Sequence, residues 1–446
     1  MNLDLLLINV VLDIEGRKKY FESLKVSKDT PRQISPHIGM AYLLAATKQR
    51  GIKSKFIDMF IDNFTVSDII EFITRNHPLA IGFTGYTTQI KETAIVARKI
   101  KELFPSIKTF IGGPHATSMP LETLNEFSCF DYTFCGEAEE SIISFFENDL
   151  NVDDILTIGS KTKNSCISKR IANLDLLPFP AWDMFKLSSY SGADPHRTKL
   201  ELPISTSRGC PGTCVFCVRP FGRKRIVRSV NSVIEEVDRN IKDFGCEALV
   251  FFDETLIENN KMDVSIDLFN EFIKKGINKK LKWSCEMRID LCDLSLFKLM
   301  REAGCYYIFF GAESADEDVL RRTGKPYTSE QIKKTILAAK ETGITCAASF
   351  ILGLPGETRE TAMKSIEMGK FLDIYSCTFP IAVPFPGTAL RRSAEVGRYG
   401  LRILTNDWDL YGKQYPGIME SESLSIGELR SLQALAYSMI PKKDII

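Results

Sequence analysis

The chain has 446 residues, a length that suggests about three domains, or a barrel of roughly two hundred residues beside a smaller domain. Basic and acidic residues are equally numerous, 57 of each, so charge does not favour a nucleic acid or an acidic membrane surface as partner. No apolar run reaches the ~18 residues of a transmembrane segment, and the first residues do not resemble a secretory signal. We therefore expect a cytoplasmic protein whose scattered cysteines, Cys135 and Cys166 among them, are mostly reduced core residues.

Residues 1–150 alternate short apolar runs with helix-like segments, a pattern typical of a doubly wound, Rossmann-like α/β sheet. The predicted strands cover 3–11, 53–58, 79–84, 108–112 and 132–135. The predicted helices cover 39–50, 65–76, 87–104, 121–125 and 139–148. Ligands of such sheets bind beyond the carboxyl ends of the strands.

Glycine-containing loops follow three of these strands, at 82–87, 112–117 and 135–140. Glycines there allow backbone amides to approach a large cofactor, and hydroxyl groups and helix N-termini can hold its polar parts. The same residues also suit ordinary helix caps and tight turns. A charged loop at 15–20 runs on to Pro36, and we expect it to lie over the same cofactor.

The stretch from 151 to 199 has weak periodicity and clustered prolines, as in Leu177-Pro-Phe-Pro180. This composition predicts a linker between two domains.

Three cysteines spaced C-x3-C-x2-C, namely Cys210, Cys214 and Cys217, follow a short apolar run in a loop with Gly and Pro. Thiolates this close favour an iron–sulfur or zinc site. A structural zinc site would normally have a fourth Cys or His, but the next cysteine is Cys246 and no histidine follows His196. An open site with three ligands is therefore the better interpretation, and a disulfide or unliganded thiols are poorer ones.

Strand-like and helix-like segments alternate again after this loop. The predicted strands cover 202–206, 248–252, 281–286, 306–311, 345–352 and 376–382. Six such units predict an open, partial barrel over 200–388, because the remaining length does not suffice for eight, and barrel sites gather at the carboxyl ends of the strands. The last segment, 389–446, contains an amphipathic helix at 425–439. This helix either shapes a substrate pocket at the open side of the barrel or only covers its core.

The cysteine loop, with Phe216 before its last cysteine, resembles the signature of the radical S-adenosylmethionine (SAM) enzymes. The resemblance implies that Cys210, Cys214 and Cys217 are the metal ligands of a 4Fe-4S cluster at the catalytic centre, with SAM on the open iron. Lys325 matches a lysine of the same family and is either functional or structural.

Polar residues that directly follow the barrel strands match further motifs of this family. By resemblance, Asp253 or Glu254 binds the ammonium group of SAM, and Arg288 its carboxylate. Gly311-Ala-Glu313-Ser314 resembles the family's Gly-x-Glu-Ser element, and the run 353–357 resembles its Gly-Leu-Pro-Gly-Glu element. Each charged residue alone also suits a surface ion pair or a helix cap. The implied SAM-binding residues are Phe216, Asp253, Glu254, Arg288, Glu313, Gly353 and Glu357.

The loops of residues 1–150 resemble the cobalamin-binding domain found in front of many radical SAM enzymes. The resemblance rests on Gly-Gly-Pro-His-Ala-Thr at 112–117 and Gly-Glu-Ala-Glu at 136–139. Asp13 is not followed by the histidine that ligates cobalt in other cobalamin proteins, an absence usual in this branch. His37, at the entry to the first helix, is either a contact or a capping residue. The implied cobalamin-binding residues are Pro36, His37, Gly39, Thr84, Thr87, Gly112, Gly113, His115, Ala116, Gly136, Glu137 and Glu140.

Together the resemblances imply a cobalamin-dependent radical SAM enzyme with a 4Fe-4S cluster, SAM and cobalamin as cofactors. Such an enzyme cleaves SAM to a 5'-deoxyadenosyl radical, abstracts a substrate hydrogen, and in our leading hypothesis methylates the carbon through methylcobalamin. The alternatives are a ring contraction, cyclisation or rearrangement without methyl transfer, and a non-catalytic cobalamin-binding sensor or carrier. A methylthiotransferase of transfer RNA fits less well, because Cys129, Cys135 and Cys166 do not match its second cluster site.

The resemblance also implies partners. We expect a small-molecule, lipid or peptide substrate and an electron donor, either a reductase or a flavodoxin or ferredoxin. The oligomeric state stays open.

Overall fold

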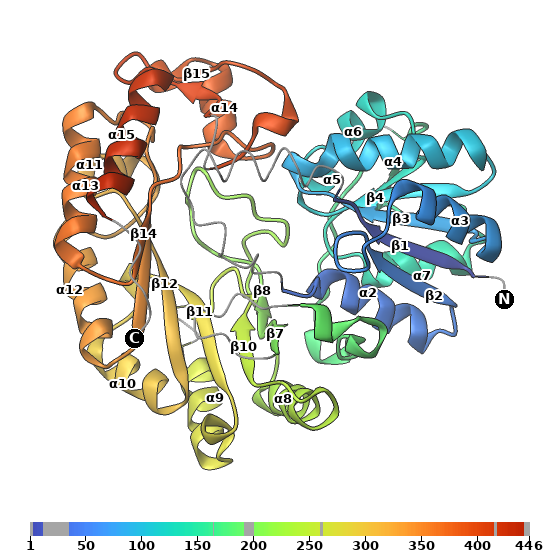
Figure 1. Ribbon diagram of the computed structural model, residues 1–446, viewed down its shortest axis with the longest axis horizontal. Helices are drawn as coiled ribbons and strands as arrows, with labels where there is room; N and C mark the ends of the chain where they lie inside the picture. The colour runs from blue at the N-terminus through green and yellow to red at the C-terminus, as the bar shows by residue number, and fades with distance from the viewer. Residues whose placement is uncertain are drawn as a thin grey trace. The chain divides into compact units, whose positions relative to one another are not determined.

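The computed structural model describes residues 3–11, 35–163, 165–190, 200–258, 262–413 and 417–440. The chain divides into two compact units, Met1–Ala193 and Asp194–Ile446, called here the first and the second unit. Each unit contains one six-stranded sheet with helices packed on it (Figure 1). The charged loop predicted at 15–20 lies outside the described residues.

The sheet of the first unit has the strand order β2-β1-β3-β4-β5-β6. Its strands are β1 (Leu5–Asn9), β2 (Ser54–Asp58), β3 (Ala80–Thr84), β4 (Lys108–Gly112), β5 (Tyr132–Phe134) and β6 (Ile158–Ser160). The first five are parallel, as predicted, and β6 pairs antiparallel with β5. The order reverses between β1 and β3, which is where sheets of this kind bind their ligands. The register aligns Asn9, Thr84 and Gly112 at that carboxyl edge.

Helices cover both faces of this sheet. They are α2 (Ile38–Gln49), α3 (Val66–Asn76), α4 (Ile90–Leu103), α5 (Pro114–Ser118), α6 (Pro120–Glu126) and α7 (Glu139–Glu147), and a 3-10 turn η1 (Thr87–Gln89) precedes α4. The predicted helix at 121–125 is therefore preceded by a second short helix, α5. Pro114 and Pro120 each begin a helix, because proline suits a first turn, where an amide hydrogen has no partner within the helix.

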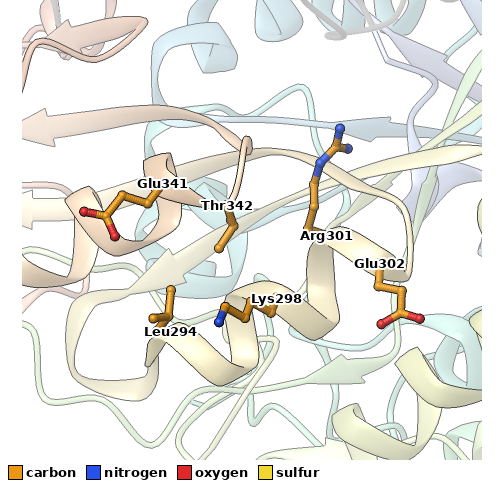
Figure 2. A pocket seen from close by; sticks show the side chains of 6 residues that line it. All are labelled: Leu294, Lys298, Arg301, Glu302, Glu341 and Thr342. Atoms are coloured by element: carbon orange, nitrogen blue, oxygen red, sulfur yellow. The ribbon is translucent and has the colours of Figure 1, made fainter.

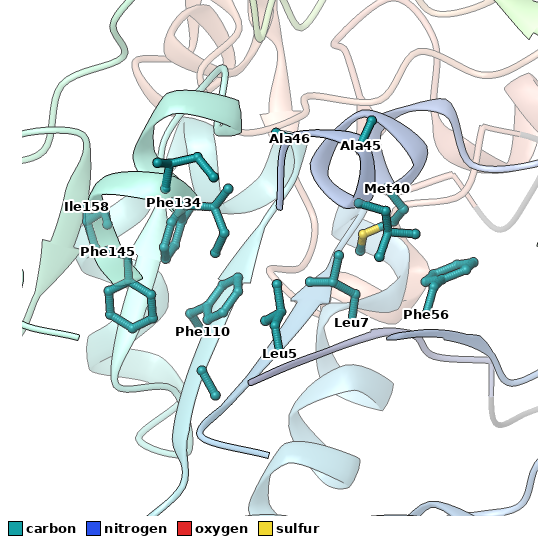
Figure 3. Packing of buried hydrophobic residues seen from close by; sticks show 14 of the residues in the cluster. Leu5, Leu7, Met40, Ala45, Ala46, Phe56, Phe110, Phe134, Phe145 and Ile158 are labelled. Carbon is teal, nitrogen blue, oxygen red and sulfur yellow. The ribbon is translucent and has the colours of Figure 1, made fainter. Parts of the chain in front are cut away.

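The core between the sheet and α2 and α7 is apolar and aromatic (Figure 3). The ring of Phe110 lies 4.4 Å from that of Phe134 and 5.9 Å from that of Phe145, measured between centroids. Leu5 and Leu7 of β1 are fully buried in the same cluster. Burial of this apolar surface fixes the strands, and with them the loops at their carboxyl ends.

The described part of the predicted linker packs on the first unit. It contributes β6 and three 3-10 turns, η2 (Leu174–Leu176), η3 (Trp182–Met184) and η4 (Leu187–Ser189). Trp182 is fully buried and its ring packs against Phe185. The amide of Ala181 donates to the carbonyl of Ala41 on α2. The division of the chain at 150, 199 and 388 remains a prediction.

The second unit is an open barrel with the strand order β14-β13-β12-β11-β10-β7. Its strands are β7 (Glu201–Ile204), β10 (Ala248–Phe251), β11 (Lys282–Arg288), β12 (Cys305–Glu313), β13 (Thr345–Phe350) and β14 (Ser376–Thr378). All five pairings are parallel, so the predicted partial barrel of six strands is confirmed. Two small antiparallel pairs accompany it, β8 (Ser207–Arg208) with β9 (Ile226–Val227), and β15 (Arg402–Ile403) with β16 (Met419–Glu420).

Helices form the outer layer of the barrel (Figure 1). They are α8 (Val230–Phe244), α9 (Met262–Lys274), α10 (Leu294–Glu302), α11 (Glu317–Arg322), α12 (Ser329–Glu341) and α13 (Arg359–Leu372), followed by α14 (Ala389–Glu395) and α15 (Ile426–Met439). Thr328, Thr358 and Ser425 begin α12, α13 and α15 with reciprocal capping boxes.

The predicted C-terminal helix is α15, and it packs on the barrel. A side chain added at Gly353, after β13, would lie 3.1 Å from Leu429 of α15. Gln433 donates to the carbonyl of Phe379, and the hydroxyl of Tyr437 accepts from its amide. Among the described residues, no helix is both long and apolar enough to cross a membrane.

Candidate functional site

The three cysteines of the predicted cluster lie in the loop between β8 and β9, and all three are free thiols. Cys217 is exposed, and the other two are half-buried. The amide of Val215 donates to the carbonyl of Thr323, just after α11. The turn at Gly324 permits this contact, because a side chain there would lie 2.6 Å from the carbonyl oxygen of Thr213. We define residues 210–217 as the cysteine loop.

Gly212 shows how closely the thiols approach one another. A Cβ atom at this position would lie 3.2 Å from Sγ of Cys210, 3.8 Å from Sγ of Cys214 and 3.1 Å from Nη1 of Arg288. The amide of Gly212 also donates to Sγ of Cys210. The space between these groups thus admits glycine and leaves two sulfurs and one guanidinium side by side.

Without an added positive charge nearby, the thiols of Cys210 and Cys217 stay protonated at neutral pH. Burial, together with Cys214 and Glu254, raises the pKa of Cys210. Although Cys217 as a whole residue is exposed, its thiol is surrounded by protein, and this desolvation together with the thiols of Cys214 and Cys210 raises the pKa of Cys217 to about 11. Bound metal would supply the positive charge that deprotonates them.

The arrangement distinguishes between kinds of metal site. Within the described ranges, no group of three or more Cys, His, Asp or Glu side chains converges closely enough to hold a single metal ion. Three thiols in one loop without a fourth ligand fit an iron–sulfur cluster, whose several irons are held by separate thiolates, better than a closed zinc site.

A buried ion pair stands beside the cysteine loop. Nζ of Lys325 lies 3.0 Å from Oε1 of Glu313, and their side chains are 5% and 8% exposed. The ammonium group also lies 5.6 Å from the ring centroid of Phe216 and 5.7 Å from that of Tyr327. Burial lowers the pKa of Lys325, but Glu313, Tyr327 and Cys214 outweigh this effect and raise it well above its usual value. Lys325 is therefore a permanent cation that connects β12 with the cysteine loop.

Glu313 is held in an unusual backbone conformation. It ends β12 at an irregularity of the register and has a positive φ of 63°. Positive φ is costly for a residue with a side chain and persists where the surroundings enforce it. Here the conformation aims the carboxylate back over Gly311, where an added Cβ would lie 2.6 Å from Oε1 of Glu313.

Arg288 is the last residue of β11, and its guanidinium group is bound by a neighbouring carboxylate. Its Nε donates to Oδ1 of Asp290 at 3.1 Å and its Nη2 to Oδ2 at 2.8 Å. Its Nη1 lies at the cysteine loop, beside Gly212. Asp290, which the sequence did not single out, thus orients the guanidinium.

Asp253, predicted to bind the ammonium group of SAM, is buried and accepts three hydrogen bonds. They come from the amide and hydroxyl of Thr206 and from the hydroxyl of Ser207. Burial raises its pKa, and these bonds oppose that effect. Its neighbour Glu254 acts electrostatically on Cys210 and Cys217. Of the two carboxylates, Glu254 is the better placed toward the cysteine loop, and the SAM contact of either remains a prediction.

The loop after β13 contains Gly353 and Glu357. Gly353 has a φ of +82°, and its amide donates to Oε2 of the buried Glu357. In the part of the chain that the structure describes, Oε1 of Glu357 has no hydrogen-bond partner. Burial raises the pKa of Glu357 to about 8. This carboxyl group is largely protonated near neutral pH and has a free hydrogen-bonding oxygen.

A cavity of about 440 Å³ lies elsewhere on the second unit (Figure 2). Lys298 and Arg301 of α10 line it together with Thr342, which follows α12. These helices lead into the amino ends of β12 and β13, whereas the predicted site residues follow the carboxyl ends. The cavity is therefore not part of the candidate site.

In the first unit, the predicted residues His37, Thr84 and Gly113 come together at the carboxyl edge. Nδ1 of His37 accepts from the amide of Met40, which makes His37 the cap of α2, and Nε2 lies 3.4 Å from Oγ1 of Thr84. Burial lowers the pKa of His37 to about 4, so the ring is neutral. Both ring nitrogens have partners within the protein.

Gly113 requires glycine. Its φ and ψ are +94° and −177°, a region that other residues rarely adopt. A Cβ atom there would lie 3.1 Å from the backbone nitrogen and oxygen of Gly85 and from Oγ1 of Thr84. The loops after β3 and β4 are therefore in close backbone contact.

The remaining predicted residues of this edge support the same two loops. Nδ1 of the buried His115 lies 3.2 Å from Oγ1 of Thr87. Pro36 and Ala116 are buried, and Gly112 ends β4. Gly39 is exposed. Hydroxyls, glycines and the neutral ring of His37 at a topological switch point fit a large cofactor such as cobalamin.

Gly136, Glu137 and Glu140 instead contact residues 165–171, a segment that we call the strap. Glu137 forms a buried ion pair with Arg170 at 2.8 Å, and it accepts from the amide of Ile171. Glu140 pairs with Lys169 at 3.0 Å on the surface. Both carboxylates are thus engaged by the strap.

A disulfide between Cys135 and Cys166 fastens the strap to the loop after β5. The prediction of reduced cysteines was therefore wrong for this pair. The two residues are 31 positions apart, and strap contacts with residues 136–140 bring them together. Gly136 has a φ of +72°, and a Cβ there would lie 1.9 Å from Oγ of Ser168. The strap therefore covers this glycine directly.

Two family models match the chain, one in each unit. The model described as the B12 binding domain matches residues 24–145. The model described as the radical SAM superfamily matches residues 204–369.

Relatives match over most of the chain. The "uncharacterized methyltransferase PH0819" of Pyrococcus horikoshii is 30% identical over 411 residues, which cover 90% of this chain and 87% of the relative. The anaerobic magnesium-protoporphyrin IX monomethyl ester cyclase of Cereibacter sphaeroides is 27% identical over 408 residues, covering 88% of this chain and 65% of the cyclase.

A solved structure has the same fold. The radical SAM methyltransferase TsrM of Kitasatospora setae, determined with cobalamin and an iron–sulfur cluster bound, matches with a TM-score of 0.73 at 16% identity. The match covers 99% of this chain and 89% of TsrM. These comparisons confirm the predicted fold class.

Proposed function

Because the chain belongs to the cobalamin-dependent radical SAM enzymes, whose cofactors are a 4Fe-4S cluster, SAM and cobalamin, we propose that it methylates an unactivated carbon. The observation that carries this proposal is the open cysteine loop: three free thiols to which the described residues add no fourth ligand, beside buried polar groups. When bound, the cluster and SAM supply a radical that removes hydrogen from carbon, and cobalamin supplies a methyl group.

The residues of the second unit would hold and orient the first two cofactors. Cys210, Cys214 and Cys217 would bind the cluster through their thiolates. Glu313, fixed by Lys325, would accept hydrogen bonds from SAM, since the buried pair holds the carboxylate in one orientation.

Two further residues would help to hold SAM. Nη1 of Arg288 would meet a carboxylate while Asp290 holds the other two nitrogens. Glu357, which is buried and accepts from the amide of Gly353, would act by shaping the loop that meets SAM.

In the first unit, we propose that cobalamin binds over the loops after β3 and β4. Thr84 and Thr87 supply hydroxyl groups, and Gly112 and Gly113 allow the backbone to approach. His37 is proposed as a positioning residue rather than a cobalt ligand, because its neutral ring is engaged with Met40 and Thr84.

A second function is supported by one specific relative. The cyclase of Cereibacter sphaeroides carries a name that does not describe methyl transfer. We rank cyclisation below methylation, because the relative named a methyltransferase is more similar, at 30% against 27% identity, and shares more of its length.

The test is anaerobic incubation of reconstituted enzyme with SAM that carries a deuterated methyl group, a reductant, and a metabolite extract of the cells that express the protein. Methylation predicts 5'-deoxyadenosine together with a product that gains a deuterated methyl group. Formation of 5'-deoxyadenosine with an unlabelled product would instead support cyclisation or rearrangement. Absence of 5'-deoxyadenosine would overturn both and leave a cobalamin carrier.

The proposal extends to the surroundings of the enzyme. Its cluster needs an external one-electron reductant, and its substrate is a small molecule, a lipid or a peptide. The requirement for a reductant supports a cytoplasmic location, whereas the disulfide between Cys135 and Cys166 is unusual for that compartment.

A further inference from the structure

The segment after the last cluster cysteine is strongly basic. Residues 218–228, which we call the basic loop, contain five basic residues and no acidic one, in a chain whose basic and acidic residues are equal in number overall. The five are Arg219, Arg223, Lys224, Arg225 and Arg228. Like charges in one short segment repel one another. Such a segment is therefore expected to have partners that compensate its charges, either inside the protein or outside it.

Two of the five are internal. Arg228 forms a buried ion pair with Glu236 and donates to the carbonyl of Ser205. Arg225 is buried, and it donates to the carbonyls of Thr255 and Leu256. These two cations fasten the basic loop to the barrel.

The other three are at least partly accessible to solvent. Arg223 and Lys224 are exposed, and Arg219 is half-buried. Nη1 of Arg219 donates to the carbonyl of Gly212 at 2.7 Å, so this arginine contacts the cysteine loop itself. Among the described residues, neither Arg219 nor Arg223 takes part in an ion pair.

The exposed cysteine begins the same segment. Cys217 directly precedes the basic loop, and of the three cluster cysteines it is the exposed one. A negatively charged partner would be drawn by charge to this surface, beside the cysteine that we propose as a cluster ligand.

We propose that Arg219, Arg223 and Lys224, together with Cys217, form the docking surface for a small acidic one-electron carrier protein. The inference rests on the proposed function, since only a redox cluster needs such a partner. One electron leaves the carrier, which is oxidised by one electron, and enters the cluster, which is reduced by one electron. No bond forms or breaks, and no proton is transferred.

The test measures cluster reduction in the absence of SAM, as bleaching of the visible absorption of the anaerobic full-length holoenzyme. Electrons come either from a flavodoxin, kept reduced by NADPH and its reductase, or from dithionite, a small reductant. In the variant Arg223→Glu/Lys224→Glu, the flavodoxin rate at low salt should fall by about tenfold or more, as expected when electrostatic steering is reversed. The dithionite rate should stay within about twofold of the wild type.

The matched control is Lys279→Glu/Lys298→Glu, which makes the same charge change near the amino ends of β11 and β12 (Figure 2 shows Lys298). It should leave both rates unchanged. Salt should slow the flavodoxin reaction of the wild type more than that of the Arg223→Glu/Lys224→Glu variant.

Three results would overturn the proposal. One is an unchanged flavodoxin rate in the variant. Another is an equal loss with dithionite, which would assign the two residues to the cluster site. The third is binding of a single-stranded DNA oligonucleotide at physiological salt that the variant loses, which would make the basic loop a nucleic-acid surface. Because cluster reduction is measured without SAM, its result does not depend on whether the enzyme transfers a methyl group. Failure of the docking proposal and failure of the proposed function can therefore be distinguished.

Discussion

The two units share a plan but differ in the chemistry of their sites. Each places its predicted residues at the carboxyl ends of parallel strands. The first unit uses glycines, hydroxyls and a neutral histidine, as at Gly113 and Thr84. The second uses thiols and buried charges, as in the pair of Lys325 with Glu313. We therefore expect substitutions that change shape to impair ligand binding at the first site, and substitutions that change charge to impair the second.

The largest effect should come from the cluster ligands. We expect the triple variant Cys210→Ala/Cys214→Ala/Cys217→Ala to lose all cluster iron, because no other group in the described part of the loop replaces a thiolate. Cobalamin binding should persist, since the residues that we propose for it lie in the other unit. Iron analysis and the visible spectrum of bound cobalamin test this. If cobalamin is lost together with iron, the two sites are not independent.

Next in size is the buried ion pair. Lys325→Met leaves Glu313 without its partner in a site that is 8% exposed, which should cost about 3–5 kcal/mol of unfolding free energy. The double variant Lys325→Met/Glu313→Gln should be more stable than the single one, because no charge remains buried. Denaturant unfolding of the cluster-free full chain measures both.

A control for the ion pair lies close by. Arg321 and Asp318 form an exposed pair on α11, so Arg321→Met should cost less than about 1 kcal/mol. Equal losses for Lys325→Met and Arg321→Met would mean that burial of the first pair is unimportant.

A smaller effect is expected from shape in the first unit. Gly113→Ala places a Cβ 3.1 Å from Gly85 at a φ of +94°, a strain of about 1–3 kcal/mol. Cobalamin affinity should fall by about tenfold or more, while iron content is unchanged. Gly51→Ala is the control, since its φ is also positive, at +72°, but nothing lies within 4 Å. Equal cobalamin titrations of the two variants would contradict a role for close packing at Gly113.

The effect that is smallest per step of the experiment, a step of one pH unit, is the dependence of stability on pH. The pKa of Glu357 is raised to about 8 in the folded protein, so the folded state holds a proton that the unfolded state has already released above about pH 5. The contribution of this proton to the free energy of unfolding is fully present below about pH 5 and is lost as the pH rises toward 8. Relative to Glu357→Gln, the wild type should therefore lose about 1 kcal/mol per pH unit between pH 5 and 8. Unfolding free energies of both proteins at several pH values test this, and a constant difference would show that Glu357 is ionised throughout.

Most of the fold could be predicted from periodicity, because the barrel strands and the first five strands of the other sheet are parallel, buried runs between helices, whereas the antiparallel β6 was not predicted. Strand ends were less predictable. The predicted strand at 376–382 stops at Thr378, and Pro380 within it has no amide hydrogen for a ladder. The predicted helix at 87–104 begins as the separate turn η1.

The candidate site was predictable where a motif is local, as in the cysteine loop. It was not predictable where a partner comes from elsewhere or has no pattern of its own. Asp290 orients Arg288 but resembles any surface acid in the sequence. Cys166 and Arg170 lie in a stretch without periodicity, so no local sequence pattern predicts their contacts with Cys135 and Glu137.

The disulfide of the strap sets a condition for handling the protein. Thiol reagents that keep Cys210, Cys214 and Cys217 available for iron also attack the bond between Cys135 and Cys166, because Cys166 is partly accessible. Air protects that bond but oxidises the thiols that we propose as iron ligands. Reducing conditions thus preserve the cysteine loop but endanger the disulfide, and oxidising conditions do the reverse. Iron and cobalamin contents should therefore be compared only between samples that were exposed to the same reductants and to the same amount of air.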